Sequence, residues 1–425
     1  MPAPGKKHAR SFPPLSHIKR IAFAVRFLHI FRLRFFPTDG ILFLSGRCAQ
    51  TVSGDEFLKT FRILVINPGS TSTKFSLFEN EKCLFTEDIF HDSGELLRFP
   101  TINDQLDFRL DVVRNYLGTH VPALKQVDAI VGRGGGCYAI PGGIYKIDDA
   151  LIDDTRHYRG GLYHASMLGV QMAARLQKDF GGMLLMQDPP VVDELCDLAR
   201  VTGVKGVYRK TACHALNLKE TARRHAQSLG KKYEECNLIV CHIDGGISIT
   251  AHQKGRMIDG NDAGGGEGPF SPTRMGSMAV TDIIGAMKDV SQSQFKALCS
   301  QAGGFSSHFG TSSSNAVHRM VEEKDPRAVR VWNAMLYQLC KYIGSMAAVL
   351  EGKVDGIVLT GGLLRFPDVE ESVRKRCGWI APIKSYPGEF EQEALASGAL
   401  RVLTGQEEAL TYPGRPVWNG FPDEQ

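Results

Sequence analysis

The sequence predicts an α/β protein with two domains of similar design. Between Arg62 and Gly230, short apolar runs typical of strands alternate with stretches typical of helices. One design, an apolar strand, a turn of small residues and a second strand, occurs at residues 62–79 and again at residues 238–252. With 425 residues, of which 43% are hydrophobic and 23% charged, the chain is long enough to bury two cores. We therefore expect duplicated domains that face one another across a cleft.

Residues 1–60 differ from the rest of the chain in charge. They hold ten Lys and Arg against three Asp and Glu, which gives +7 and leaves −3 for residues 61–425. Arg26, Arg32 and Arg34 interrupt their apolar residues, so they contain no run long enough to span a bilayer. A targeting presequence, a surface-binding amphipathic segment and sequence translated from a misassigned start all agree with this composition. We expect a basic N-terminal extension outside the fold, and favour the misassigned start.

Composition and motifs argue against several classes of function. A mildly acidic body does not favour nucleic-acid binding. The ten cysteines show no Cys-x-x-Cys pair and no metal-ligand spacing, which is typical of reduced thiols in a cytoplasmic protein. The chain also has no P-loop, HExxH or GxSxG motif, so the usual signals of P-loop NTPases, zinc proteases and α/β-hydrolases are absent.

The first strand–turn–strand segment is a candidate phosphate site. The apolar run Ile63–Ile66 leads to Asn67 and a Pro-Gly turn, and Lys74 follows five small or hydroxylated residues. Such a turn at the tip of a hairpin exposes backbone N–H groups and hydroxyls together, and a phosphate binds through both. An ordinary Ser/Thr-rich hairpin turn has the same composition, so both interpretations stay open.

Two charged residues follow buried strands in the first half. The strand predicted for residues 127–131 leads to Arg133, which lies among glycines, so its guanidinium can meet a ligand without obstruction. A surface arginine in a glycine-rich loop is the alternative. The strand predicted for residues 183–187 leads to Asp188, just before two prolines. Asp188 is suited to capping a helix, and equally to holding a metal or accepting a proton.

The second half offers a matching set. His214 lies in the first turn of a predicted helix, where a structural and a catalytic role are both open. The hairpin at residues 238–252 has Asp-Gly-Gly at its turn and would form a second phosphate-holding turn. Arg274 is the one arginine of the glycine-rich loop at residues 262–276.

Towards the C-terminus the pattern predicts core helix, strand and helix. Residues 331–350 repeat apolar side chains at helical spacing, which predicts a core helix. The strand predicted from residue 356 runs into Gly361 and Gly362, where a flat ring could approach the backbone. The last helix begins after residue 387 with acids in its first turns, as the helix dipole favours. Residues 412–425 are expected to be loose.

From Arg62 to Gly405 the chain resembles the acetokinase family. The resemblance rests on ten motifs in order: INPGSTSTK, VDAIVGRGG, IPGG, YHAS, DPPVVDE, CHALN, GGIS, GEGPFSPTR, VDGIVLTGGL and YPGEFEQEALASGALRVL. It implies two ribonuclease-H-like βββαβα domains, as in sugar kinases, actin and heat-shock ATPases, that close over ATP. One domain would hold residues 61–195 and the C-terminal helix 393–405. The other, nucleotide-binding domain would hold residues 196–392, and residues 406–425 would form a tail.

The resemblance implies reversible transfer of the γ-phosphoryl group of ATP, with Mg²⁺, to butyrate or a branched short-chain carboxylate. Arg133 and Arg274 would clamp the carboxylate and the phosphoryl group, and His214 would donate to the transition state. Asp188 would take part in catalysis and, with Glu393, would hold Mg²⁺. The residues implied for phosphate and nucleotide are Asn67, Ser70, Thr71, Thr73, Lys74, Asp244, Gly245, Gly246, Gly361 and Gly362. A homodimer or larger homo-oligomer is also implied.

One departure from the family pattern concerns the second turn. The family usually has three glycines there, and in this chain Asp244 takes the place of the first. A carboxylate near a triphosphate repels it unless a cation intervenes. Another short-chain carboxylate kinase, for acetate, propionate or isobutyrate, and a nucleotide-binding paralogue without kinase activity are therefore alternative functions.

Overall fold

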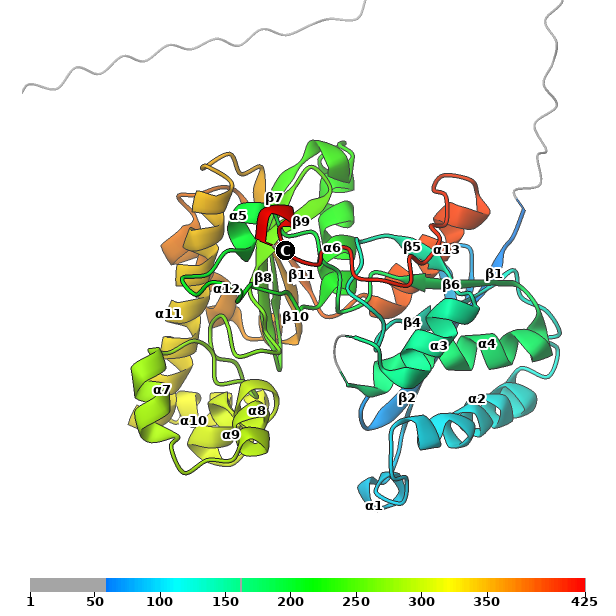
Figure 1. Ribbon diagram of the computed structural model, residues 1–425, viewed down its shortest axis with the longest axis horizontal. Coiled ribbons are helices and arrows are strands. Elements are labelled where there is room, and N and C mark those ends of the chain that lie inside the picture. Colours follow the sequence, from blue (N-terminus) through cyan, green and yellow to red (C-terminus); the bar gives the residue numbers. More distant parts are fainter. Residues whose placement is uncertain (1–58, 161–162, 425) are drawn as a thin grey trace, which may run out of the picture. The chain divides into compact units, whose positions relative to one another are not determined.

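The computed structural model describes residues 59–160 and 163–424, and residues 58–425 form one compact unit. Almost all of the expected N-terminal extension therefore lies outside the described residues. Two mixed β-sheets, one of six strands and one of five, form the framework of this unit (Figure 1). Among the described residues, no helix is long and apolar enough to cross a membrane. The nine cysteines that the structure describes are all free thiols.

The first sheet has the strand order β3-β2-β1-β4-β6-β5. Its first three strands form an antiparallel meander, whereas β4 is parallel to β1 and β6 is parallel to β4. The carboxyl ends of β1, β4 and β6 therefore meet at one edge, where ligands of such sheets bind. The strands are β1 (Arg62–Pro68), β2 (Ser72–Glu79), β3 (Lys82–Phe90), β4 (Ala129–Arg133), β5 (Ile144–Lys146) and β6 (Met183–Gln187).

The second sheet repeats this design with the order β11-β10-β7-β8-β9. Again three strands form an antiparallel meander, and β10 lies parallel to the first of them and to β11. The repeated topology is the duplication that the two hairpins predicted. The strands are β7 (Asn237–Ile243), β8 (Ile247–Gln253), β9 (Arg256–Gly260), β10 (Gly356–Gly361) and β11 (Ile383–Pro387).

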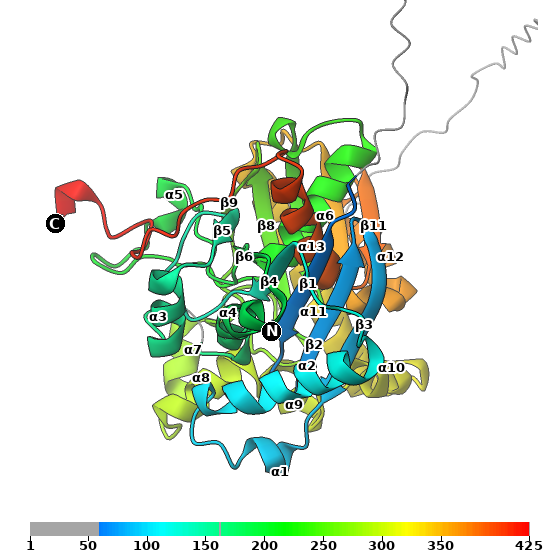
Figure 2. The ribbon, with the colours of Figure 1, turned by 90° about the vertical axis from the view of Figure 1, so that its right-hand side faces the viewer.

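Helices cover both faces of each sheet (Figures 1 and 2). The first six α-helices along the described chain are α1 (Ser93–Leu96), α2 (Leu106–His120), α3 (Asp149–His157), α4 (Leu168–Phe180), α5 (Asp197–Arg200) and α6 (Ala215–Ser228). The second half adds α7 (Val280–Ala286), α8 (Gln292–Ser300), α9 (Gly304–Phe309), α10 (Ser314–Glu322), α11 (Pro326–Val349), α12 (Pro367–Cys377) and α13 (Glu391–Leu403).

The expected core helix is α11. It begins with Pro326, and the side chain of Asp325 caps it by accepting the N–H of Ala328 at 2.7 Å. Its apolar stripe is buried against the second sheet, and Trp332 in its first half is fully buried. The helix was predicted from apolar residues spaced at i, i+3, i+4 and i+7, and the structure buries the face that these residues form.

The C-terminal helix α13 returns to the first sheet. Ala394, Leu395 and Ala399 pack in one cluster with Ile63 and Val65 of β1. The packing brings the start of α13 to the end of β1. The assignment of this helix to the first domain remains a prediction, as does a domain boundary near residue 195.

The C-terminal tail is anchored rather than loose, which corrects the expectation for residues 412–425. Tyr412 is buried and donates its hydroxyl hydrogen to Asp154 at 2.8 Å. Further on, the ring of Trp418 packs edge-on against Tyr208 at 4.9 Å between centroids. Aromatic pairs of this kind stabilise a structure beyond the effect of their buried area. These contacts hold the tail against the fold.

Candidate active site

Strand residues of the first sheet and loop residues near 212–214, 264 and 274 line one cavity of about 310 Å³. It lies where β1 and β4 end, so Asn67 and Arg133 reach it from the first sheet. The lining residues are Asn67, Pro68, Gly69, Ser72, Lys74, Asp88, Arg133, His164, Ser166, Pro190, Ala212, Cys213, His214, Gly264, Arg274 and Glu391. The sequence analysis had assigned roles to Asn67, Lys74, Arg133, His214 and Arg274, and the structure brings all five together.

The turn between β1 and β2 is held from behind by Arg109 of α2. This fully buried side chain donates to the carbonyls of Ser72 at 2.7 Å and Ser70 at 3.3 Å, and to Thr73 Oγ1 at 3.1 Å. Burial lowers the pKa of its guanidinium to about 10, so it stays charged at pH 7. Sequence analysis missed this residue, because a single arginine on a helix gives no local sign that it is buried.

The hydroxyls of this turn divide into two groups. Thr73 is buried and hydrogen-bonds His91 Nε2 at 2.8 Å as well as Arg109, while Ser70 and Thr71 are exposed and do not line the cavity. Ser72 does line it. Within β2, Ser72 therefore faces the cavity and Thr73 faces away from it, because alternate residues of a strand point to opposite faces. Phosphate contacts of Ser70, Thr71 and Thr73 remain predictions.

Arg133 is fixed by a carboxylate from the far end of the chain. Its Nη2 lies 2.9 Å from Glu391 Oε1, and Glu391 Oε2 accepts a hydrogen bond of 2.9 Å from Asn67 Nδ2. Arg133 Nη1 is buried and has no hydrogen-bond partner among the described residues. Buried donors without a partner are rare in folded proteins. Arg133 is thus held by one nitrogen and offers the other to a ligand.

Arg274 lies against the turn of the second hairpin. A Cβ atom at Gly246 would come within 2.3 Å of the Arg274 guanidinium, so only glycine leaves room for it. Ser271 and Thr273 attach this loop to the turn, since both hydroxyls donate to the carbonyl of Gly245, at 2.7 and 2.8 Å. The second glycine turn therefore positions an arginine, a role that its composition alone did not indicate.

His214 precedes α6 and lies beside both arginines in the cavity wall. Its Nδ1 is 2.9 Å from Ser248 Oγ, and its ring stacks on His242 with centroids 3.9 Å apart. Burial, together with His242, Arg274 and Arg133, holds the pKa of His214 well below 6.5. The imidazole is neutral at pH 7 and can donate one N–H to a ligand without carrying charge into the cavity.

Comparison with known proteins identifies the family. The model of the acetokinase family matches residues 199–376. A probable butyrate kinase of Enterococcus faecalis (strain ATCC 700802 / V583) is 43% identical over 352 residues, which cover 82% of this chain and 97% of that protein. The chain belongs to the acetokinase family. A probable butyrate kinase of Clostridium botulinum (strain Alaska E43 / Type E3) is 42% identical, and the match covers 83% of this chain and all of that protein.

Solved structures share the fold at lower identity. The acetate kinase of Porphyromonas gingivalis has a TM-score of 0.64 at 19% identity, covering 81% of this chain and 100% of that one. A propionate kinase from Francisella tularensis subsp. tularensis SCHU S4 has a TM-score of 0.61 at 16% identity, covering 80% and 98%. The expected family and fold class are confirmed: the chain is a carboxylate kinase, a phosphotransferase with a carboxyl acceptor.

Asp244, the departure from the family pattern, uses both of its oxygens inside the protein. Oδ1 accepts the N–H of Gly245 at 2.7 Å, and Oδ2 accepts the N–H of Gly362 at 2.6 Å. Gly361 adopts φ +106°, and a Cβ there would lie 2.4 Å from the carbonyl oxygen of Ile243. Asp244 thus links the hairpin turn to the Gly-Gly turn. It also accepts hydrogen bonds from two N–H groups that could otherwise donate to a phosphate.

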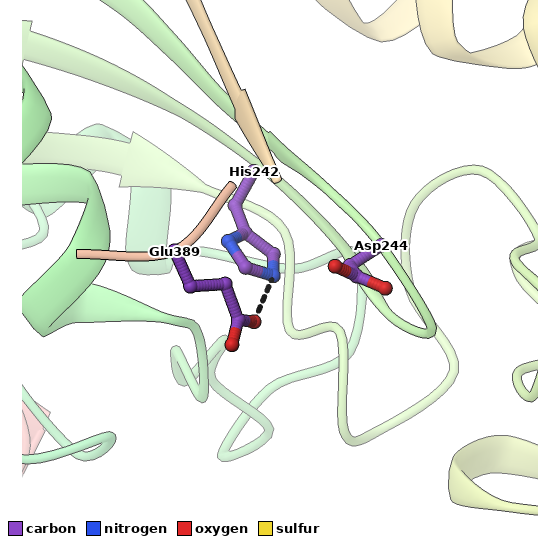
Figure 3. A group of neighbouring side chains, drawn as sticks. All are labelled: His242, Asp244 and Glu389. Atoms are coloured by element: carbon purple, nitrogen blue, oxygen red, sulfur yellow. Dashed lines mark ion pairs between the residues drawn. The ribbon is translucent and has the colours of Figure 1, made fainter. Parts of the chain in front are cut away.

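His242, Asp244 and Glu389 form the one group of three potential metal ligands found among the described residues, with ligand atoms within 4.8 Å of one another (Figure 3). His242 Nε2 lies 3.6 Å from Glu389 Oε1. Asn217 Nδ2 donates to His242 Nδ1 at 2.9 Å, while Asn217 Oδ1 accepts the N–H of Phe390 at 3.0 Å and so fixes the amide. The imidazole proton must then lie on Nε2. Neutral His242 with its proton on Nε2 therefore has no free lone pair for a metal.

The carboxylates near this histidine repel one another. Burial, Glu391 and Asp244 raise the pKa of Glu389 to about 7. Burial alone would also raise the pKa of Glu391, but Arg133 and the hydrogen bond from Asn67 lower it overall. An excess of carboxylate charge at one side of an anion-binding cavity favours a divalent cation with oxygen ligands.

Neither acid that the sequence analysis chose for metal lines the cavity. Asp188 is fully buried, where Oδ1 accepts the N–H of Gly143 at 2.8 Å and Oδ2 pairs with Arg223 at 3.4 Å. No helix begins directly after it, so it is not a helix cap either. Glu393 is exposed and lines a different pocket with Arg223. Side chains two residues apart on a helix point about 200° apart, so Glu391 lines the cavity and Glu393 does not.

Replacing Arg109 with Met should disorder the first turn. Several buried acceptors lose a charged donor, so the free energy of unfolding should fall by about 2–3 kcal/mol, and ATP affinity should fall about tenfold. Urea unfolding and calorimetric titration measure both. Arg114→Met is the matched control, since Arg114 lies on the same helix in a half-exposed pair with Asp179. Equal ATP affinity in the two variants would contradict the prediction that Arg109 shapes the turn for ATP binding.

Asp244→Gly should tighten ATP binding about tenfold, because it removes a negative charge and frees two backbone N–H groups for phosphate. Asp244→Asn separates the two causes, since it removes only the charge. Dissociation constants with MgATP measure the effect. Weaker binding by the glycine variant would mean instead that Asp244 places the metal.

Glu389→Gln should change the pH dependence of stability. Because the pKa of Glu389 is raised from 4.5 to about 7, the folded protein holds the proton longer than the unfolded chain, and stability falls as pH rises through that window. The side chain is 45% exposed, so solvent limits the effect to about 1 kcal/mol. Metal-free urea unfolding at pH 5 and pH 8 should show this loss in the natural protein and not in the variant. Glu393→Gln is the control.

Proposed function

We propose that the chain catalyses ATP-dependent, reversible phosphorylation of butyrate, or of a branched short-chain carboxylate, to the acyl phosphate. One observation carries the proposal: Arg133, Arg274 and a neutral His214 converge on a single cavity. Two guanidinium groups suit a carboxylate and a phosphoryl group, both planar or trigonal anions with several oxygens. The similarity to probable butyrate kinases supports butyrate over other acids.

In the proposed reaction a carboxylate oxygen attacks the γ-phosphorus of ATP. The new O–P bond forms as the bond from phosphorus to the β-phosphate oxygen breaks, and ADP leaves with that electron pair. The acid is already ionised at pH 7, so no base is required. Arg133 and Arg274 hold the two reactants in line and stabilise the charge of the transferring group, and His214 adds a neutral N–H donor.

Nucleotide phosphates would bind between the two glycine turns. Asn67, Ser72 and Lys74 offer an amide, a hydroxyl and a cation at the first turn. On the other side, the backbones of the turns at residues 244–246 and 361–362 would approach the phosphates and adenosine. Mg²⁺, held by Glu389 and Glu391, would neutralise phosphate charge when bound. These residues would orient the phosphates even before any transfer occurs.

Hydroxylamine trapping tests the proposal. The purified protein with MgATP and butyrate should yield butyryl hydroxamate at a rate proportional to enzyme concentration. Acids of two to five carbons, straight and branched, then rank the substrates by kcat/KM. A highest kcat/KM with acetate or propionate would identify the enzyme as an acetate or propionate kinase of the same family. ATP binding without acyl phosphate from any acid would contradict the proposal and favour a nucleotide-binding paralogue.

Arg274→Ala should lower kcat by about 10²–10³, the effect of removing one donor that acts in a transition state. Arg274→Lys should recover only part of the loss, because it keeps the charge without the planar fork. Steady-state kinetics with butyrate measure both variants. Arg319→Ala, an exposed arginine of α10, is the control. An unchanged kcat in Arg274→Ala would remove this residue from the reaction.

A further inference from the structure

A second and larger cavity, of about 830 Å³, adjoins the first one. Ala212 and Gly264 line both cavities. A Cβ atom built on Gly264 would lie 3.7 Å from the Cβ of Ala212, so these two residues are neighbours. Of these two shared residues, only Ala212 has a side chain, a single methyl group, so neither blocks the place where the cavities meet.

The orientation of a bound acid follows from the first cavity. Its charged groups, Arg133 and Arg274, must hold the carboxylate, while Pro190, Ala212 and Cys213 offer the apolar wall. Burial raises the pKa of the Cys213 thiol to about 11, so it is neutral and contributes to that wall. With its carboxylate at the arginines, the hydrocarbon end of the acid faces the wall that the second cavity shares.

The second cavity is suited to hydrocarbon. Its apolar lining comes from Ala139, Val191, Val207, Tyr208, Pro416 and Trp418. The two arginines beside them are paired: Arg200 lies 2.8 Å from Asp193, and Arg209 lies 2.9 Å from Asp259 and 3.0 Å from Glu267. Lys210 and Asp262 complete the charged lining. The apolar part of the wall, with its arginines already neutralised, favours a hydrocarbon chain over a further anion.

The C-terminal tail forms part of the wall of this second cavity. Trp418 packs on Tyr208, and the Arg200 guanidinium lies 4.8 Å from the centre of its ring. Both contacts hold the tail over the segment that leads to Ala212. A volume of about 830 Å³ lies in the range of pockets that bind drug-sized ligands, and butyrate alone has no use for it.

We propose that the acyl site continues past Ala212 and Gly264 into this second cavity, and that the enzyme takes monocarboxylic acids of about six to eight carbons. The inference rests on the proposed function, since it assumes that the carboxylate binds at Arg133 and Arg274. Each further buried methylene then favours the longer acid about fourfold.

Kinetics with butyrate, hexanoate and octanoate test the inference in the full-length protein. We expect kcat/KM for hexanoate and octanoate to exceed that for butyrate. Val207→Trp, which places an indole in the second cavity, should lower the octanoate-to-butyrate ratio of kcat/KM at least tenfold. Val204→Trp is the matched control: Val204 is also exposed, at 62% against 54% for Val207, and lines neither cavity. Its ratio should match that of the natural protein.

A binding measurement gives a second readout. Octanoate without ATP should change the tryptophan emission of the natural protein, and Trp418→Phe should abolish that change. Turnover of butyrate without turnover of octanoate, or an equal ratio in the two valine variants, would overturn the inference and leave the proposed function intact. Failure of all acids to give acyl phosphate would overturn the proposed function, and the inference with it.

Discussion

The carboxylate of Glu391 is the interaction on which the site depends. It binds Asn67 at the end of β1 and Arg133 at the end of β4, and it comes from the first turn of the last helix. Without it a buried guanidinium would lose its counter-charge, which is costly in a folded protein. The helix therefore has to pack on the first sheet before Arg133 can be held in place, so the geometry of the site depends on completion of the fold.

The two glycine turns look alike in sequence and act differently. The first is a strand end whose backbone is fixed by Arg109 from behind, with its small side chains turned to the cavity or away from it by strand alternation. The second leaves space for a guanidinium at Gly246 and gives its N–H groups to Asp244. One turn is built to offer donors, and the other to place Arg274. A duplicated fold thus supplies two unlike halves of one site.

Local pattern predicted the features that depend on local sequence. Strand ends, glycine turns and the apolar stripe of α11 are determined within a few residues, so Arg133, Arg274 and His214 could be singled out as candidates, while the roles predicted for them came from the family resemblance. Glu391 could not be told from Glu393, because the choice depends on the rotation of a helix against a distant sheet. Asp188 matched a motif but is buried against Gly143 and Arg223, and the role of Arg109 exists only in the packed protein.

The structure separates the groups suited to phosphoryl transfer from those suited to selecting an acyl chain. Arg133 lies at the end of a strand, and His214 and Glu391 lie at helix starts. Arg274 lies in a loop that Ser271 and Thr273 attach to the second hairpin turn. The outer apolar wall comes from the segment at residues 206–209 and from a tail held by aromatic packing at Trp418. Substitutions in these two segments can reshape the space for a hydrocarbon without moving the charged clamp. A family with one reaction can in this way serve carboxylic acids of different length.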